Sequence, residues 1–116
     1  MSSVRAVAPA KINLSLRLRA LRPDGYHEIT TVFHAVSLTD DVTVGAAAPG
    51  AGRSVTTTGE RSASVPGGDD NIAGKAAVAL AHYAGLVDPD VTIDIAKSIP
   101  VAAGMAGGSA DAAAAL

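Results

Sequence analysis

The sequence contains no cysteine and no tryptophan, and its 116 residues include one phenylalanine and two tyrosines. The lack of cysteine excludes disulfide bridges and thiolate metal sites, and it fits a reducing compartment. The scarcity of aromatics leaves few side chains to stack on nucleic-acid bases, and it predicts that alanine and valine fill most of the core. With 48% hydrophobic and 17% charged residues, the composition is that of one globular domain.

No apolar run approaches the roughly 18 residues that a membrane-spanning helix needs. The N-terminus also lacks the apolar stretch of a signal peptide. We therefore expect a soluble cytoplasmic protein with no membrane partner. The net charge of -2 argues against a dedicated nucleic-acid-binding protein.

Positive charge is concentrated at the start of the chain. Residues 1–23 carry five of the nine basic residues and no acidic one. Such a segment attracts anionic ligands locally. Arg17 and Arg19 alternate along an expected strand and are expected to face water, whereas Lys11 lies among small and apolar residues.

The pattern of the first half of the chain predicts β-strands. Strands are expected at Val4–Ala8 and Ile12–Leu18, separated by Pro9 because proline cannot donate to a central ladder. Ile12, Leu14, Leu16 and Leu18 alternate with polar residues at a period of two. Pro23-Asp24-Gly25 predicts a turn, followed by strands at Glu28–Leu38 and Val42–Val44. Residues 45–69 predict a loop with one weak strand near Val55–Thr58.

The second half alternates helix, strand and helix. Asp70-Asn71 predicts an N-cap for a helix from Ile72 to about Ala84, with Gly85 as its C-terminal cap. Its apolar face is expected to hold Ile72, Ala76, Ala79, Leu80 and Tyr83. Val91–Ala96 predicts a strand, and a second helix is expected from about Ser109 to Leu116. The expected fold is α+β, with a mostly antiparallel sheet, helices on one side and an incomplete core.

A glycine-rich loop lies between that last strand and helix. Strand, loop and helix in this order aim backbone N–H groups and the positive helix end at an anion. The loop has neither the lysine of a Walker A motif nor the spacing of a dinucleotide fingerprint. A tight turn packed against a helix explains it equally well. Ser109 has three candidate roles, which are capping the helix, contacting a phosphate and helping to hold Mg²⁺. Asp111 in the first helical turn is favoured by the helix dipole, which makes a structural role the better interpretation than metal binding.

Two smaller clusters carry possible chemistry. Lys11 and Asn13 project from the same face of a strand, opposite Ile12 and Leu14, and together can orient a hydroxyl or a phosphate. The alternative is a solvated strand face. After the turn, Tyr26 can stack on a base and His27 can bond its edge, or both are simply surface residues. The three histidines have no zinc-like spacing.

Four segments taken in order resemble one enzyme family. PAKINL (9–14), RPDGYHEI (22–29), DNIAGKA (70–76) and IPVAAGMAGGSADAA (99–113) are similar to 4-diphosphocytidyl-2-C-methyl-D-erythritol kinases. These belong to the superfamily of galactokinase, homoserine, mevalonate and phosphomevalonate kinases. The resemblance covers essentially the whole chain, and its DGYH turn is the most specific part.

The resemblance implies a reaction and a set of site residues. ATP with Mg²⁺ would phosphorylate the 2-hydroxyl of the cytidylated methylerythritol, in the non-mevalonate route to isoprenoid precursors. Lys11 would be catalytic, Asn13 would contact the substrate, and Tyr26 and His27 would hold the cytosine. Ser109 is a candidate Mg²⁺ ligand. The ATP-binding residues would be Pro100, Val101, Ala102, Ala103, Gly104, Met105, Ala106, Gly107, Gly108, Ser109 and Ala110.

The sequence departs from the family in two ways. Met105 and Ala106 replace a common Leu-Gly pair, so a backbone that needs positive φ at Ala106 would be strained. The family's catalytic aspartate lies downstream of the loop, farther along than Asp111. We therefore expect residues 1–116 to be a partial N-terminal ATP-binding domain that lacks the C-terminal domain and is inactive alone.

Two alternative functions stay open at this point. One is another small-molecule kinase of the same superfamily, which cytidine dependence of substrate binding would separate. The other is a non-enzymatic RNA-binding module of the related ribosomal-protein fold, which a steep salt dependence of RNA binding would reveal. The expected partner is a small-molecule substrate, with no nucleic acid.

Overall fold

The computed structural model describes residues 2–116 and contains one four-stranded sheet in the order β1-β2-β4-β3. The strands are β1 (Ser3–Leu21), β2 (His27–Ala46), β3 (Ser54–Thr58) and β4 (Val91–Ala96). Strand β2 is antiparallel to β1 and to β4, and β3 is parallel to β4. The mostly antiparallel sheet expected from the sequence is confirmed.

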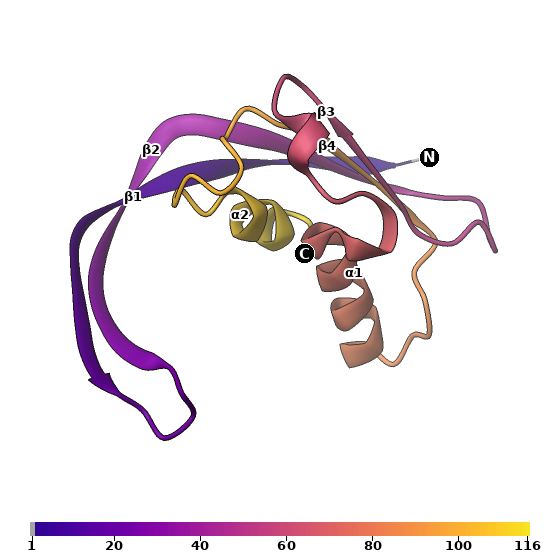
Figure 1. Cartoon of the computed structure of the whole chain (residues 1–116). Helices are drawn as coiled ribbons and strands as arrows, with labels where there is room; N and C mark the ends of the chain where they lie inside the picture. The colour runs from indigo at the N-terminus through magenta and orange to yellow at the C-terminus, as the bar shows by residue number, and fades with distance from the viewer. Residues whose placement is uncertain (1) are drawn as a thin grey trace.

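Two α-helices, α1 (Ile72–Tyr83) and α2 (Gly107–Ala114), lie on one side of this sheet (Figure 1). Short 3₁₀ helices, η1 (Ser62–Ser64) and η2 (Gly68–Asp70), lead into α1. Asn71 caps α1, because its side-chain oxygen accepts a hydrogen bond from the Ala73 amide at 2.9 Å. None of the helices in the described residues is long and apolar enough to cross a lipid bilayer.

Gly85 ends α1 as expected. Its φ of +77° is a backbone conformation that suits glycine, its amide donates to His82 O, and the Leu86 amide donates to Ala81 O. These two bonds form a Schellman motif.

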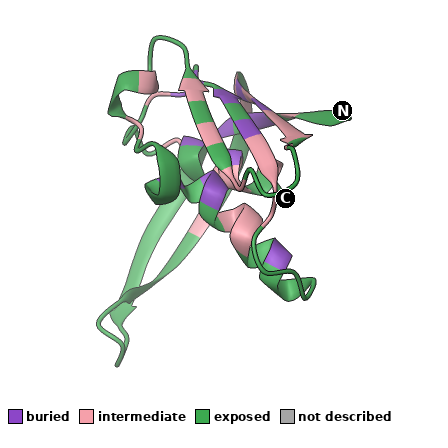
Figure 2. Ribbon diagram, turned by 90° about the vertical axis from the view of Figure 1, so that its right-hand side faces the viewer, coloured by how far each residue is buried: buried purple, intermediate pink, exposed green. Residues whose placement is uncertain are grey.

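Strands β1 and β2 form one long curved hairpin rather than four separate strands. Pro9 interrupts the pairing without ending β1, since the register shifts between Pro9 and Lys11. A proline is tolerated here because β1 is an edge strand. Gly25 closes the hairpin with a φ of +84°, which confirms the expected turn. The hairpin tip projects away from both helices as an exposed arm (Figures 1 and 2).

A bulge in β1 overturns the simple period-two prediction for this strand. Asn13 pairs with Phe33, but Ser15 pairs with Val32, so β1 contains one extra residue. Leu16 pairs with Thr31, and Thr31 shares a face with Phe33. Asn13 and Leu16 therefore lie on the same face, and the four apolar residues from Ile12 to Leu18 do not form one continuous apolar side. All four are exposed.

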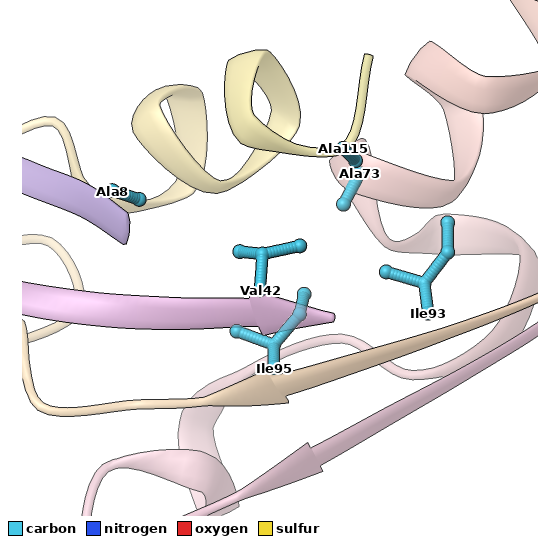
Figure 3. Packing of buried hydrophobic residues seen from close by; sticks show 6 residues of the cluster. All are labelled: Ala8, Val42, Ala73, Ile93, Ile95 and Ala115. Atoms are coloured by element: carbon cyan, nitrogen blue, oxygen red, sulfur yellow. The ribbon is translucent and has the colours of Figure 1, made fainter. Parts of the chain in front are cut away.

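The core lies between the body of the sheet and the two helices (Figure 3). It contains Ala8, Val42, Ala73, Ile93, Ile95 and Ala115. Alanines are numerous, as the composition predicts, but the largest fully buried apolar side chains are isoleucines at 93, 95 and 99. Small alanines let the helices approach the sheet closely.

The apolar face predicted for α1 is wrong. Ile72, Leu80 and Tyr83 are exposed, and the buried positions are Ala73, Gly74 and Ala81. The small face is buried because Gly74 lies against Val55 and Arg53, where an added Cβ would be 3.0 Å from Val55 Cγ2. Close packing thus selects small residues over large apolar ones.

Candidate functional site

A cavity of about 460 Å³ opens beside the glycine-rich loop and the start of α2. Its lining joins the loop to the segment that precedes and begins α1. From the loop side it includes Pro100–Gly104, Ala106–Ser109 and Asp111, and from the other side Val65, Pro66 and Asp70–Ile72. Met105 and Ala110 belong to the predicted loop but do not line the cavity.

Helix α2 begins at Gly107, two residues earlier than expected, and Ser109 does not cap it. The N-cap is Ala106, which has no side chain able to accept a hydrogen bond. The first amides of a helix have no carbonyl partner within it. Gly107, Gly108 and Ser109 bring such amides to the cavity, so this wall can bind an anion.

The loop backbone is strained at two alanines. Ala102 and Ala106 both have φ of +57°, in the left-handed region that disfavours a Cβ. The sequence predicts strain at Ala106 if this position needs a positive φ, and the structure shows that it does. Such strain is typical of functional loops held by their surroundings.

Lys11 contacts this loop from β1. Its Nζ donates to Gly104 O at 2.6 Å and to Asn13 Oδ1 at 2.7 Å, and it lies 5.0 Å from the centre of the Phe33 ring. Its backbone amide donates to Met105 O at 3.1 Å. The free edge of β1 therefore holds the loop, and Lys11 and Asn13 share a face as predicted.

Tyr26 and His27 lie elsewhere, at the tip of the hairpin arm. Tyr26 is 74% exposed, and its amide donates to Asp24 Oδ1. His27 Nδ1 lies 3.0 Å from Arg19 O. Like Lys11 and Asn13, neither residue lines the cavity. No hydrogen bond of the described residues joins Tyr26 or His27 to Lys11 or to the loop, so the structure does not bring these two residues together with them.

Sequence reasoning missed a buried ionic network beneath the loop. Lys97, at the end of β4, donates to Asp40 Oδ2 at 2.5 Å and to Asp111 Oδ2 at 2.9 Å. Asp40 Oδ1 accepts from the Ser98 and Ile99 amides. The exposed fractions of Lys97, Asp40 and Asp111 are 5%, 0% and 3%. The network joins β2 and α2 to the segment that enters the loop.

The sequence did contain a signal for this network. The alternation of Val91, Ile93 and Ile95 continues through position 97 to Ile99, which places Lys97 on the buried face of β4. Asp40 likewise precedes Val42 and Val44 at a spacing of two. A charged residue in phase with a buried apolar series needs a buried partner.

The protonation equilibria of the network follow from burial and pairing. Burial opposes ionisation of Lys97, but the hydrogen bonds that Lys97 donates to Asp40 and Asp111 outweigh it and raise the pKa of Lys97. Burial also opposes ionisation of Asp40, but its hydrogen bonds hold the pKa of Asp40 below its ordinary value. Burial, with the neighbouring Asp40 carboxylate, raises the pKa of Asp111 to about 6 against the opposing effect of Lys97.

Asp111 thus has the structural role favoured from the sequence, but for another reason. It lies beyond the first turn of α2, where the helix dipole has little effect. Its partner is Lys97. Among the described residues, its Oδ1 is a buried side-chain oxygen without a hydrogen-bond partner.

The raised pKa of Asp111 predicts a pH-dependent stability. The folded state binds the proton more tightly than the unfolded chain, so this contribution is present below about pH 3.8 and is lost as pH rises through about 6. The rise from 3.8 to about 6 is roughly two pKa units. At about 1.4 kcal/mol per unit, the loss is on the order of 3 kcal/mol. Asp111→Asn should flatten the pH dependence of the unfolding free energy between pH 4 and 6, measured with urea.

Asp94→Asn is the matched control, since Asp94 is an exposed carboxylate on β4. It should retain the slope of the unmodified chain. An equal slope in the chain with and without the Asp111 substitution would contradict the assignment.

Two adjacent glycines at the start of α2 should respond differently to alanine. A Cβ on Gly107 would lie 2.8 Å from Ile99 Cγ2 and 3.1 Å from Lys97 Nζ, whereas one on Gly108 would lie 3.7 Å from Ile72 Cγ2. Gly107→Ala should destabilise the chain by about 1–3 kcal/mol through overpacking. Gly108→Ala should be neutral or stabilising by up to about 1 kcal/mol, because alanine favours helix. Urea unfolding of both variants checks this, and equal effects would contradict the packing.

Known proteins that this chain resembles in sequence are kinases. Residues 71–116 match the family described as "GHMP kinases N terminal domain". A 4-diphosphocytidyl-2-C-methyl-D-erythritol kinase of Nocardia farcinica is 54% identical over 115 residues, covering 99% of this chain and 36% of the relative. The kinase of that name from Mycolicibacterium smegmatis is 53% identical over 111 residues, covering 96% and 33%. The chain thus spans about a third of the length of these curated relatives.

Solved structures agree with the sequence relatives. A crystal structure of 4-(cytidine 5'-diphospho)-2C-methyl-D-erythritol kinase superposes with a TM-score of 0.73 at 37% identity, covering 97% of this chain and 38% of that one. A homoserine kinase from Cytophaga hutchinsonii, at 16% identity and a TM-score of 0.67, covers 97% and 33% and shares the fold. The resemblance that the motifs predict is confirmed: residues 71–116 match the N-terminal domain of GHMP kinases, and in sequence and fold the chain is similar to about a third of a 4-diphosphocytidyl-2-C-methyl-D-erythritol kinase.

Proposed function

We propose that residues 1–116 supply the N-terminal, ATP-binding part of a kinase that phosphorylates the 2-hydroxyl of 4-diphosphocytidyl-2-C-methyl-D-erythritol, a step toward isoprenoid precursors in the cytoplasm. The names of the relatives motivate the substrate. The observation that carries the proposal is that Gly104 contacts both the cavity and Lys11. Gly104 lines the cavity, and its carbonyl accepts a hydrogen bond from Lys11.

The cavity supports nucleotide binding by its size and its walls. Small side chains at Ala102, Ala103 and Gly104 let phosphate oxygens approach the backbone, and the first amides of α2 are free to donate. Phosphoryl transfer depends mainly on positioning and on stabilising charge. In this proposal Pro100–Ala110 holds the ATP phosphates, with Met105 and Ala110 supporting the loop from outside the cavity.

Lys11 is the proposed catalytic residue. It lies on β1 where the glycine-rich loop contacts that strand through Gly104 O. Its ammonium group would stabilise the negative charge that develops between the transferred phosphoryl group and the acceptor hydroxyl. Asn13, bonded to Lys11, would contact the same hydroxyl-bearing part of the substrate. In the structure two of the three Lys11 N–H donors bind Asn13 Oδ1 and Gly104 O, which leaves the third for the substrate.

Tyr26 and His27 are proposed to hold the cytosine. Their distance from the loop along the hairpin arm suits this role, because a diphosphate separates the base from the methylerythritol hydroxyls in this substrate. Tyr26 offers an exposed ring for stacking, and His27 offers Nε2 for a hydrogen bond.

A Mg²⁺ ion that arrives with the nucleotide fits these residues. Within residues 2–116, no three His, Cys, Asp or Glu side chains gather where they would hold a metal ion unaided. Mg²⁺ on a nucleotide needs only one or two protein oxygens besides phosphate and water. Ser109, in the cavity wall, would supply a hydroxyl. The ion would neutralise phosphate charge.

The catalytic aspartate and the C-terminal domain are proposed to come from sequence beyond residue 116. The coverage of about a third of each relative supports this. Alone, residues 1–116 should therefore bind ATP without measurable turnover.

A chimera tests the proposal directly. Residues 1–116 replace the matched segment of the Mycolicibacterium smegmatis relative, and ATP-dependent phosphorylation of the cytidylated substrate is measured. We expect activity in the chimera and a loss of at least about 100-fold in kcat on Lys11→Met, as for removal of one charge-stabilising group. The KM for ATP should change little.

Lys75→Met is the matched control, because Lys75 is an exposed lysine of α1 outside the cavity lining. It should leave kcat unchanged. Full activity of the Lys11→Met chimera would refute the catalytic assignment. An active chimera that accepts substrates lacking cytidine equally well would refute the substrate.

A further inference from the structure

The bulge in β1 lies beside Lys11 and is closed by a side chain of the neighbouring strand. The pairing shifts by one residue between Asn13 and Ser15. At this point the Thr31 hydroxyl of β2 donates to Ser15 O at 2.7 Å. Bulges leave a ladder group without its usual partner and redirect nearby side chains. Thr31 therefore supplies a hydrogen-bond donor to the Ser15 carbonyl at the bulge and stabilises the geometry of the bulge.

The same hydroxyl determines how Asn13 is oriented. A hydroxyl carries a single hydrogen, and that of Thr31 is committed to Ser15 O. Toward Asn13 it can act only as an acceptor, and it accepts from Asn13 Nδ2 at 2.8 Å. With its NH₂ group on Thr31, the Asn13 amide presents Oδ1 to Lys11 Nζ at 2.7 Å.

The chain of hydrogen bonds ends at the glycine-rich loop. Lys11 has three N–H donors, of which one goes to Asn13 Oδ1 and one to Gly104 O. If Asn13 were turned, its NH₂ group would face the ammonium group, and two donors would repel. The direction of the Lys11 side chain thus depends on an acceptor that Thr31 fixes.

We propose that Thr31 is a positioning residue, which orients Asn13 and through it holds the Lys11 ammonium group against the glycine-rich loop. The proposal deepens the proposed function, because it rests on Lys11 as the residue that acts on the transferred phosphoryl group. The hydrogen-bond chain itself exists independently of any activity, so it can be tested in the 116-residue chain.

The test compares three variants of this chain by nuclear magnetic resonance. Thr31→Val keeps the side-chain shape and removes the hydroxyl. Thr31→Ser keeps the hydroxyl. Thr30→Val is the matched control on the same strand, since it also removes a hydroxyl with a hydrogen bond, which Thr30 Oγ1 accepts from Arg19 Nε at 3.1 Å. The readouts are hydrogen exchange of the Asn13 side-chain amide and the Lys11 ammonium signal.

Thr31→Val should accelerate exchange of the Asn13 amide about fivefold, as expected for the loss of one exposed hydrogen bond, and should broaden the Lys11 ammonium signal. Thr31→Ser and Thr30→Val should retain both signals. Unchanged Asn13 and Lys11 signals in Thr31→Val, or equal changes in Thr30→Val, would overturn the proposal.

Kinetics in the chimera separate this proposal from the proposed function. Thr31→Val should lower kcat by about 10- to 100-fold with an unchanged KM for ATP, because a displacement of about 1 Å at a catalytic group can cost up to about 100-fold, and Thr31→Ser should restore kcat. An inactive chimera with the expected Asn13 and Lys11 signals would confirm the positioning chain and refute the catalytic function.

Discussion

The buried bridge from Lys97 to Asp40 and Asp111 is the interaction on which the rest of the structure depends. It joins β2, the end of β4 and α2, and therefore fixes both ends of the glycine-rich loop. Such a network is expensive to bury, because each charge loses its hydration. Asp40 offsets this loss of hydration by accepting hydrogen bonds from two backbone amides in addition to the one from Lys97. With the loop ends fixed, the left-handed alanines at 102 and 106 can be held in place.

The molecule combines this rigid body with a slender arm. The body has a small, alanine-rich core, and α2 begins at the cavity. The arm is a two-stranded hairpin with little buried surface (Figure 2). Tyr26 and His27 lie at the turn that closes it. Lys11 lies where arm and body meet. Its bonds to Gly104 O and to the Asn13–Thr31 pair link the two parts.

The sequence predicts those parts of this arrangement that depend on a few neighbouring residues, such as helix caps and residues two positions apart on a strand. Asn71 and Gly85 bound α1 as expected, because capping depends on single residues and a few backbone angles. The pairing of Lys11 with Asn13 followed from their spacing of two. The loop was recognised from its glycines, and the strain at Ala106 followed from the replaced glycine.

The failures arose where distant contacts decided the outcome. The bulge at Asn13 inverted the faces of β1, and no local pattern marks a bulge that Thr31 closes from the other strand. The buried face of α1 was chosen by close approach to β3, which favours Gly74 over Leu80. Lys97 and Asp40 are 57 residues apart, and each was visible only as a charge in phase with apolar neighbours.

A double-mutant cycle on Lys97→Met and Asp40→Asn tests the central role of the bridge most directly. Each single variant should lose about 3 kcal/mol or more of unfolding free energy, because it removes one charge of the closer ion pair and leaves the other buried charge with weaker compensation. The double variant should lose clearly less than the sum, since both charges of the Lys97–Asp40 pair are then removed, and the coupling should exceed about 1 kcal/mol. Strictly additive losses, or single losses within about 0.5 kcal/mol of zero, would contradict the account.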